Sequence, residues 1–306
     1  MPDVDVTSEQ HREGLHVVCR VKPRAVRAPG QAETKSGPGT VALAEGSPPT
    51  AVREVMTGIE HEFEGVCGEM STQEEVYAAA GGSSLVQHVL EGGAASLFAY
   101  GQTGSGKTHS MIGVPSAQLT AGSGIVPRVA SALLAASDAG QTASRTRTRA
   151  SRKASKNKER DQAASLVIQA AELYNERLYD LLGGDGTKPD SGDAAASLVA
   201  SHSAASCAEL GGAAVAVVRS AVDACAKVQQ ALEARTVAAT AMNAESSRSH
   251  CIIALTPVVG AKPLGTFILC DLAGCEKAKR TGAEGASLVE AYVTRRNSHA
   301  NSHLLL

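Results

Sequence analysis

The stretch FAYGQTGSGKTHS, Phe98–Ser110, decides the fold class of this chain. Within it, Gly101–Thr108 fits the pattern G-x-x-x-x-G-K-[ST], in which a glycine-rich loop turns its backbone N–H groups toward the phosphates of a nucleotide. The apolar run 95–100 precedes it, as a buried parallel strand would. A helix is expected after Gly106, with its positive end facing the phosphates. We call Gly101–Thr108 the phosphate loop.

Each position of the phosphate loop has an expected role in binding a nucleoside triphosphate. The glycines allow positive φ angles, so that backbone N–H groups can turn inward. Lys107 would reach the β- and γ-phosphates, and Thr108 would offer its hydroxyl to Mg²⁺. The expected phosphate-binding residues are Gly101, Gln102, Thr103, Gly104, Ser105, Gly106, Lys107 and Thr108.

Two other segments could complete such a site. In FILCDLAG an apolar run ends at Asp271, whose carboxylate would hold Mg²⁺ through water, and Gly274 would free a backbone N–H for the γ-phosphate. Taken alone, D-x-x-G is more often a turn at a strand end. The polar run NAESSRSH, Asn243–His250, would ordinarily be a surface loop. Opposite a bound triphosphate, however, its side chains can supply phosphate and Mg²⁺ ligands.

Composition limits the class of protein. The chain has 306 residues, of which 43% are hydrophobic but only 3% aromatic, so we expect an aliphatic, Ala-rich core. The seven cysteines include no C-x-x-C pair, which favours reduced thiols in a cytosolic protein. The N-terminus lacks the shape of a signal peptide, and no apolar run reaches the ~20 residues of a membrane span. Residues 145–160 hold eight Lys or Arg and one Glu, so an acidic remainder carries one basic segment that could meet an acidic partner.

The order of expected elements predicts an α/β fold, in which a sheet has helices on both faces. The elements are a strand at 15–21, weak strands within 24–58, a helix opened by a capping box at Ser71–Glu74, helices after Gly106 and Pro127, a strand leading into a short helix over 165–182, a helix over 220–234, and a hairpin of HCIIALTPVV and GTFILCDLAG. Residues 137–163 are expected to be a disordered basic insertion, and 183–213 a low-complexity loop.

At this point the ordered motifs resemble a known family. GQTGSGKT, NAESSRSH and DLAGCE follow one another as in the kinesin motor domain, and STQEEVY, ELYNERLYDLL and RTVAATAMN agree with the connecting sequence. The resemblance covers about residues 15–291. It implies a phosphate-loop NTPase fold with a central, mostly parallel, twisted sheet and helices on both faces, from which the last strand and the C-terminal helices are missing. The incomplete motor domain would span 14–291, after a disordered tail at 1–13.

The resemblance also implies where adenine binds. RVKP resembles the R-x-R-P motif of the family, with Lys22 in place of the second Arg. Arg20 and Pro23 would pack on the adenine of ATP, with Tyr77 and His109 nearby. We expect that the aliphatic stem and charge of Lys22 preserve nucleotide binding.

Residues around the γ-phosphate receive their roles from the resemblance as well. Ser246 and Ser247 would bind the γ-phosphate and Mg²⁺, and Arg248 would pair with Glu276 to close the site around the attacking water. The ordinary alternative is an exposed ion pair worth about 0–1 kcal/mol. The implied catalytic residues are Ser247, Arg248, Gly274 and Glu276, and the implied metal ligands are Thr108, Ser247 and, through water, Asp271.

The partner implied is the microtubule, contacted near Lys277, Lys279 and Arg280. The segment 141–163 resembles an insertion, which is expected to be a solvated loop rather than a contact with tubulin or nucleic acid. Residues 292–306 depart from the family pattern. The family strand between those matching 15–21 and 95–100 has no counterpart, so we expect a gap in the sheet and an incomplete motor.

The leading interpretation is a Mg²⁺-dependent ATPase that couples ATP hydrolysis to microtubule-based movement in the cytoplasm, at the cytoskeleton. The first alternative is a non-motile ATP-binding or tubulin-interaction protein derived from a truncated kinesin. The second is an unrelated phosphate-loop NTPase whose basic segment binds nucleic acid. The ordered motifs disfavour nucleic acid, and the N-K-x-D motif of GTPases is absent.

Overall fold

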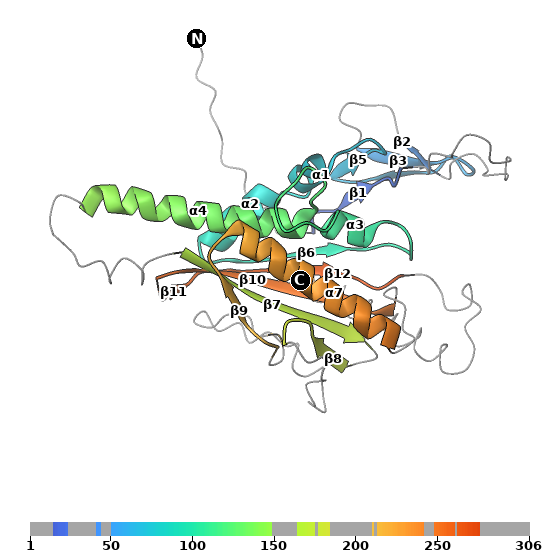
Figure 1. Ribbon diagram of the computed structural model, residues 1–306. Helices are drawn as coiled ribbons and strands as arrows, with labels where there is room; N and C mark the ends of the chain where they lie inside the picture. Colours follow the sequence, from blue (N-terminus) through green and yellow to red (C-terminus); the bar gives the residue numbers. More distant parts are fainter. Residues whose placement is uncertain are drawn as a thin grey trace, which may run out of the picture.

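The computed structural model describes residues 15–23, 41–43, 50–148, 164–174, 177–183, 210, 213–241, 248–260 and 262–275. These residues form one large sheet, two small sheets and a layer of helices (Figure 1). Among the helices in these ranges, none combines the length and the apolar content that a membrane span requires. The segments expected as a tail (1–13) and as an atypical end (292–306) lie outside the described residues.

The large sheet has seven strands, five of them in the order β6-β12-β10-β7-β8, while β11 pairs with β10 and β9 pairs with β7. Their bounds are β6 Ala94–Ala99, β7 Ala164–Tyr174, β8 Arg177–Asp180, β9 Ala216–Val218, β10 His250–Val259, β11 Lys262–Pro263 and β12 Thr266–Asp271. The expected hairpin of β10 and β12 is confirmed.

The sheet is mixed rather than mostly parallel, which corrects the expectation from the sequence. Only the β6–β12 pairing is parallel among the described strands of this sheet, and β12–β10, β10–β7, β7–β8 and β7–β9 are all antiparallel. For β7–β8 and β10–β12 the physical reason is the short connection, because strands joined by a few residues can pair only as antiparallel hairpins.

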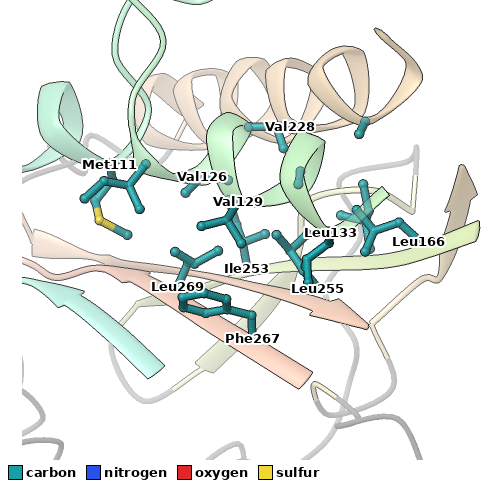
Figure 2. Packing of buried hydrophobic residues seen from close by; sticks show 14 of the residues in the cluster. Met111, Val126, Val129, Leu133, Leu166, Val228, Ile253, Leu255, Phe267 and Leu269 are labelled. Carbon is teal, nitrogen blue, oxygen red and sulfur yellow. The ribbon is translucent and has the colours of Figure 1, made fainter. Parts of the chain in front are cut away.

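The described helices cover one face of the large sheet. They are α1 Gln73–Ala79, α2 Gly82–Leu90, α3 Lys107–Met111, α4 Ile125–Thr148 and α7 Ala221–Ala241. Figure 2 shows Val129 and Leu133 of α4 packed over Ile253, Leu255 and Phe267 of the sheet. Full burial of each such side chain contributes about 1.5–3 kcal/mol, so α4 is fixed mainly by its apolar face.

The opposite face of the sheet has a separate apolar cluster. Ile252, Ala254 and Cys270 alternate with the residues that face the helices, and they pack with Leu210 and Ala213. No residue of a described helix belongs to this cluster. The expectation of helices on both faces is therefore met on one face only, within the part of the chain that the structure describes.

The capping box of α1 lies one residue later than expected. Thr72 is the N-cap: its Oγ1 accepts from the backbone N–H of Glu75, and the Glu75 carboxylate accepts from the backbone N–H of Thr72 at 2.7 Å. Helix α1 ends before Gly81, whose φ of 69° a residue with a Cβ rarely adopts. The glycine pair thus divides one apolar segment into α1 and α2.

Two expectations about element type are wrong. The short helix expected near residue 180 is strand β8, which pairs with β7 and buries Leu178 and Tyr179. Pairing with a neighbouring strand overrides the local helical preference there. Helix α4 continues to Thr148, so 137–148 is helical rather than disordered. The rest of the basic insertion, 149–163, lies outside the described residues.

Strand β1, Val18–Arg20, belongs to a different sheet from β6. It pairs in parallel with β5, Gly65–Cys67, while β2 Val41–Leu43, β3 Ala51–Glu54 and β4 Glu60–Glu62 form a third sheet. No described strand pairs with the outer edge of β6. The gap expected between 15–21 and 95–100 is therefore present among the described strands.

Candidate nucleotide-binding site

The phosphate loop lies between β6 and α3, as its pattern predicts. Gly101 and Gly104 have φ angles of 156° and 76°. A Cβ at Gly101 would lie 2.6 Å from Ser105 Oγ, so the turn requires glycine there. Gln102, Thr103 and Gly104 are exposed, which leaves this part of the loop accessible to a ligand.

Two lysines hold the loop from different sides. Lys107 Nζ donates to the carbonyl oxygens of Gly101 at 2.9 Å and Gln102 at 3.0 Å, so its ammonium lies across the loop. Lys22 Nζ donates to the carbonyl oxygen of Gly104 at 2.7 Å. Lys22, which stands where the resemblance expects a second Arg, thus brings a cation from the end of β1 to the phosphate loop.

Asp271 lies beside the start of the loop because β12 pairs in register with β6, with Asp271 opposite Ala99. Thr108 Oγ1 donates to Asp271 Oδ2 at 2.5 Å. Asp271 is only 4% exposed, and its Oδ1 has no hydrogen-bond partner among the described residues. A hydroxyl and a carboxylate oxygen are ligands that suit Mg²⁺, so the residues present fit the metal that the sequence predicts.

The segment after Asp271 runs along the loop. The backbone N–H of Leu272 donates to the Ala99 carbonyl, and that of Cys275 donates to the Gly101 carbonyl, each at 3.3 Å. Gly274, between them in the chain, is buried next to the loop. Gly274 therefore lies at the edge of the sheet where the phosphate loop begins, and its expected role as a sensor of the γ-phosphate stays a prediction.

A buried ion-pair network behind Asp271 was not predicted. Arg235 of α7, only 4% exposed, donates from Nη1 to Asp271 Oδ2 at 2.9 Å and from Nε to Glu172 Oε1 at 3.3 Å. Its Nη2 donates to the carbonyl of Ser249 at 3.1 Å, and the Ser249 hydroxyl donates to Glu172. Burial alone would lower the pKa of Arg235, but the facing Cys251, Asp271 and Glu172 raise it above its ordinary value. The guanidinium therefore links the carboxylate of the site to the segment that follows the polar run.

On the other side of α3, three elements bring together Arg20, Gln73 and His109. Arg20 Nη1 donates to Gln73 Oε1 at 3.0 Å and to Ser110 Oγ at 2.9 Å. Gln73 Nε2 donates to the His109 carbonyl at 2.7 Å and lies 3.0 Å from His109 Nε2. Partial burial of the ring, and then the charge of Arg20, lower the pKa of His109, although the residue as a whole is exposed. Arg20 and His109 thus share Gln73 as a partner, and their expected roles at adenine stay predictions. Gln73 itself was missed, because a glutamine at a helix start gives no signal of its burial.

Tyr77 lies one turn after Gln73 on α1, and its ring packs against Gly82. A Cβ at Gly82 would lie only 2.2 Å from Tyr77 Cε2. Burial raises the pKa of its hydroxyl. Pro23 follows β1 and is exposed. Their expected roles at adenine remain predictions.

Several expected site residues lie outside the described ranges: Ser246, Ser247, Glu276, Lys277, Lys279 and Arg280. The expected pair of Arg248 with Glu276 therefore stays a prediction. Arg248 itself is half-buried and directly precedes Ser249 of the buried network.

Known proteins resemble this chain over most of its length. The family model described as the kinesin motor domain matches residues 20–297. Kinesin-like protein KIN-14N of Oryza sativa subsp. japonica is 31% identical over 283 residues, which are 90% of this chain and 33% of that protein. Kinesin-like protein KIN-14C of Arabidopsis thaliana is 30% identical over 305 residues, 95% of this chain and 35% of that protein. The chain thus spans about a third of the length of these curated relatives.

Solved structures agree with these matches. The structure of a fast kinesin, described with implications for ATPase mechanism and interactions with microtubules, aligns with a TM-score of 0.64 at 26% identity and covers 91% of this chain and 71% of that one. The Drosophila kinesin family member Kin10/NOD, in complex with divalent manganese and ADP, aligns with a TM-score of 0.58 at 21% identity over 86% of this chain and 72% of that one, a likeness of fold.

Proposed function

Since the chain belongs to the kinesin motor-domain family, we propose that it binds and hydrolyses Mg·ATP and couples this reaction to movement along microtubules. The observation that supports this proposal most directly is the hydrogen bond from Thr108 to Asp271. It joins the end of the phosphate loop to the carboxylate at the end of β12, so two oxygen groups that could serve a nucleotide-bound Mg²⁺ lie together.

Lys107 and the loop N–H groups would bind the phosphates. The ammonium of Lys107 already lies across the loop, and a charged phosphate oxygen is a stronger acceptor than the carbonyls of Gly101 and Gln102. Thr108, with Ser247 from outside the described residues, and Asp271 through water would hold Mg²⁺, which neutralises charge on the phosphates when it is bound. Arg20, Pro23, Tyr77 and His109 would contact the adenine side.

Hydrolysis would depend on positioning rather than on covalent chemistry. Gly274 would donate its backbone N–H to the γ-phosphate, and Arg248, paired with Glu276, would exclude bulk water and orient the attacking molecule. Arg248 is well placed to respond to this site, because the next residue, Ser249, contacts Arg235 and Glu172 of the buried network.

The proposed macromolecular partner is the microtubule, contacted through Lys277, Lys279 and Arg280. The matched fast kinesin is described with interactions with microtubules, and Drosophila NOD, also matched, was docked together with bovine tubulin into a cryo-EM map of NOD complexed to the microtubule. The corresponding location would be the cytoplasmic microtubule cytoskeleton. A non-motile ATP-binding protein would hydrolyse ATP without acceleration by microtubules.

The test is the binding of a fluorescent ATP analogue with Mg²⁺, followed by ATP turnover with and without microtubules. Lys107→Ala should abolish most of the binding, since it removes the main phosphate cation. The matched control is Lys262→Ala, an exposed lysine of β11, which should bind as the original chain does. Unchanged binding by Lys107→Ala would refute the site, and turnover that microtubules fail to accelerate would refute the motor function.

A further inference from the structure

The side-chain amide of Gln73 is buried, only 5% exposed, at the junction of three elements. It lies between Arg20 of β1 and His109 of α3, while Gln73 itself begins α1. None of the expected nucleotide-binding roles includes this residue. Its hydrogen bonds determine the orientation of its own amide and, through that amide, which ring nitrogen of His109 carries the proton.

The orientation of the amide follows from its partner on β1. A guanidinium can only donate, so the Gln73 atom that lies 3.0 Å from Arg20 Nη1 must be the oxygen. The NH₂ group therefore faces His109. There it meets the His109 carbonyl at 2.7 Å and the ring Nε2 at 3.0 Å, and it has one hydrogen for each.

The protonation state of His109 follows in turn. Because the amide donates to Nε2, this nitrogen must carry the lone pair, and a neutral imidazole then has its proton on Nδ1. A charged imidazolium would set N–H against N–H.

We propose that Gln73 is a positioning residue of the nucleotide site, which fixes His109 as the neutral Nδ1–H tautomer. His109 is exposed and lies two residues after Lys107, so the ring would offer a hydrogen-bond donor at the mouth of the site. Such a donor suits an acceptor nitrogen or oxygen of a nucleotide. This last consequence rests on the proposed function, whereas the tautomer does not.

The same amide also holds Arg20 against α3. Arg20 Nη1 donates to Ser110 Oγ at 2.9 Å, and Ser110 Oγ lies 3.1 Å from the carbonyl oxygen of Gly106, the N-cap of α3. Loss of the Gln73 oxygen would leave Arg20 with one fewer acceptor. Gln73 therefore orders two residues on which the adenine side of the site would depend.

The direct test is ¹⁵N NMR of the histidine rings in the full chain at pH 7.5, with His109 assigned through the variant His109→Gln. The expected result is a protonated Nδ1 and a lone pair on Nε2 in the protein without nucleotide. A protonated Nε2, or a cationic ring, would overturn the proposal. This measurement needs no change at Gln73, so it holds whether or not a variant folds.

The second test is Gln73→Glu, which replaces the donor with an acceptor. His109 should then switch to the Nε2–H form, because the carboxylate that replaces the amide can only accept a hydrogen bond from Nε2. ATP affinity should fall about tenfold, the loss expected when a buried hydrogen bond is replaced by a mismatch. A retained Nδ1–H form would overturn the proposal.

The matched control is Gln118→Glu, at an exposed position of the loop that follows α3. It makes the same chemical change and should alter neither the tautomer of His109 nor the affinity for ATP.

The proposed function and the inference about Gln73 can fail separately. If the original chain shows the Nδ1–H form but does not bind Mg·ATP, the proposed function fails, and if it binds Mg·ATP with an Nε2–H ring, the inference about Gln73 fails.

Discussion

Thr108 Oγ1 donates a hydrogen bond to Asp271 Oδ2 at 2.5 Å, although 163 positions separate the two residues in the sequence. The parallel pairing of β6 with β12 makes this contact possible, because it brings the carboxyl ends of the two strands to the same edge of the sheet. The same Oδ2 also accepts from Arg235. The carboxylate is thus held from two sides through one oxygen, and Oδ1 stays open among the described residues.

We expect Asp271→Asn to weaken ATP binding mainly when Mg²⁺ is present, since the amide keeps the shape of the side chain but removes its charge. Affinity measured in EDTA should change little, whereas the gain in affinity that Mg²⁺ gives the original chain should fall at least about tenfold, as loss of a charged ligand contact implies. Asp223→Asn, at the exposed start of α7, is the control. A Mg²⁺ effect of the original size in Asp271→Asn would exclude Asp271 from the metal site.

The Arg235 network should be important for stability as well as for the site. Arg235→Met would leave Glu172 and Asp271 buried without their cation, and breaking a buried ion pair in this way costs about 3–5 kcal/mol. Urea unfolding should show this loss, and Arg219→Met, at an exposed position before α7, should not.

The double variant Arg235→Met/Glu172→Gln gives the charge argument a sharper test. Removing one of the two carboxylates should recover part of the stability that Arg235→Met loses, because less uncompensated charge remains buried. If the two losses simply add, the contribution of Arg235 is packing of its aliphatic stem and not charge balance.

Local sequence predicted the phosphate loop and the residues beside it, because the pattern of glycines, Lys107 and Thr108 is set by backbone geometry within one turn. It could not predict Arg235 or Gln73. Each acquires its role from a residue 36 positions away, Asp271 in one case and His109 in the other. The same limit explains strand β8, whose identity comes from pairing with β7. Long-range contacts of this kind leave no periodic trace in the chain.

Thiol reactivity should distinguish the cysteine at the site from those in the sheet. Burial raises the pKa of Cys251 to about 11, and it raises the pKa of Cys270 further, so neither forms much thiolate near pH 8. Cys275 is half-buried beside the phosphate loop. We therefore expect iodoacetamide to modify Cys275 well before Cys251 and Cys270, and Mg·ATP to slow that reaction. Peptide mass spectrometry after short exposures measures the order, and prior modification of Cys270 would contradict the buried position of β12.

Gly274→Ala should separate hydrolysis from binding. Gly274 is buried in the segment whose neighbours, Leu272 and Cys275, donate backbone hydrogen bonds to the start of the phosphate loop. A contact made by its N–H to the γ-phosphate would matter most as charge redistributes in the transition state, so a methyl group that displaces this backbone should depress turnover strongly. ATP affinity should stay within about tenfold of the original, because the loop, Lys107 and Thr108 remain in place.

Cys275→Ser, one position later, is the matched control, and it should turn over ATP normally. Equal losses of affinity and turnover in Gly274→Ala would mean that this glycine is needed for folding of the segment and not for sensing the γ-phosphate.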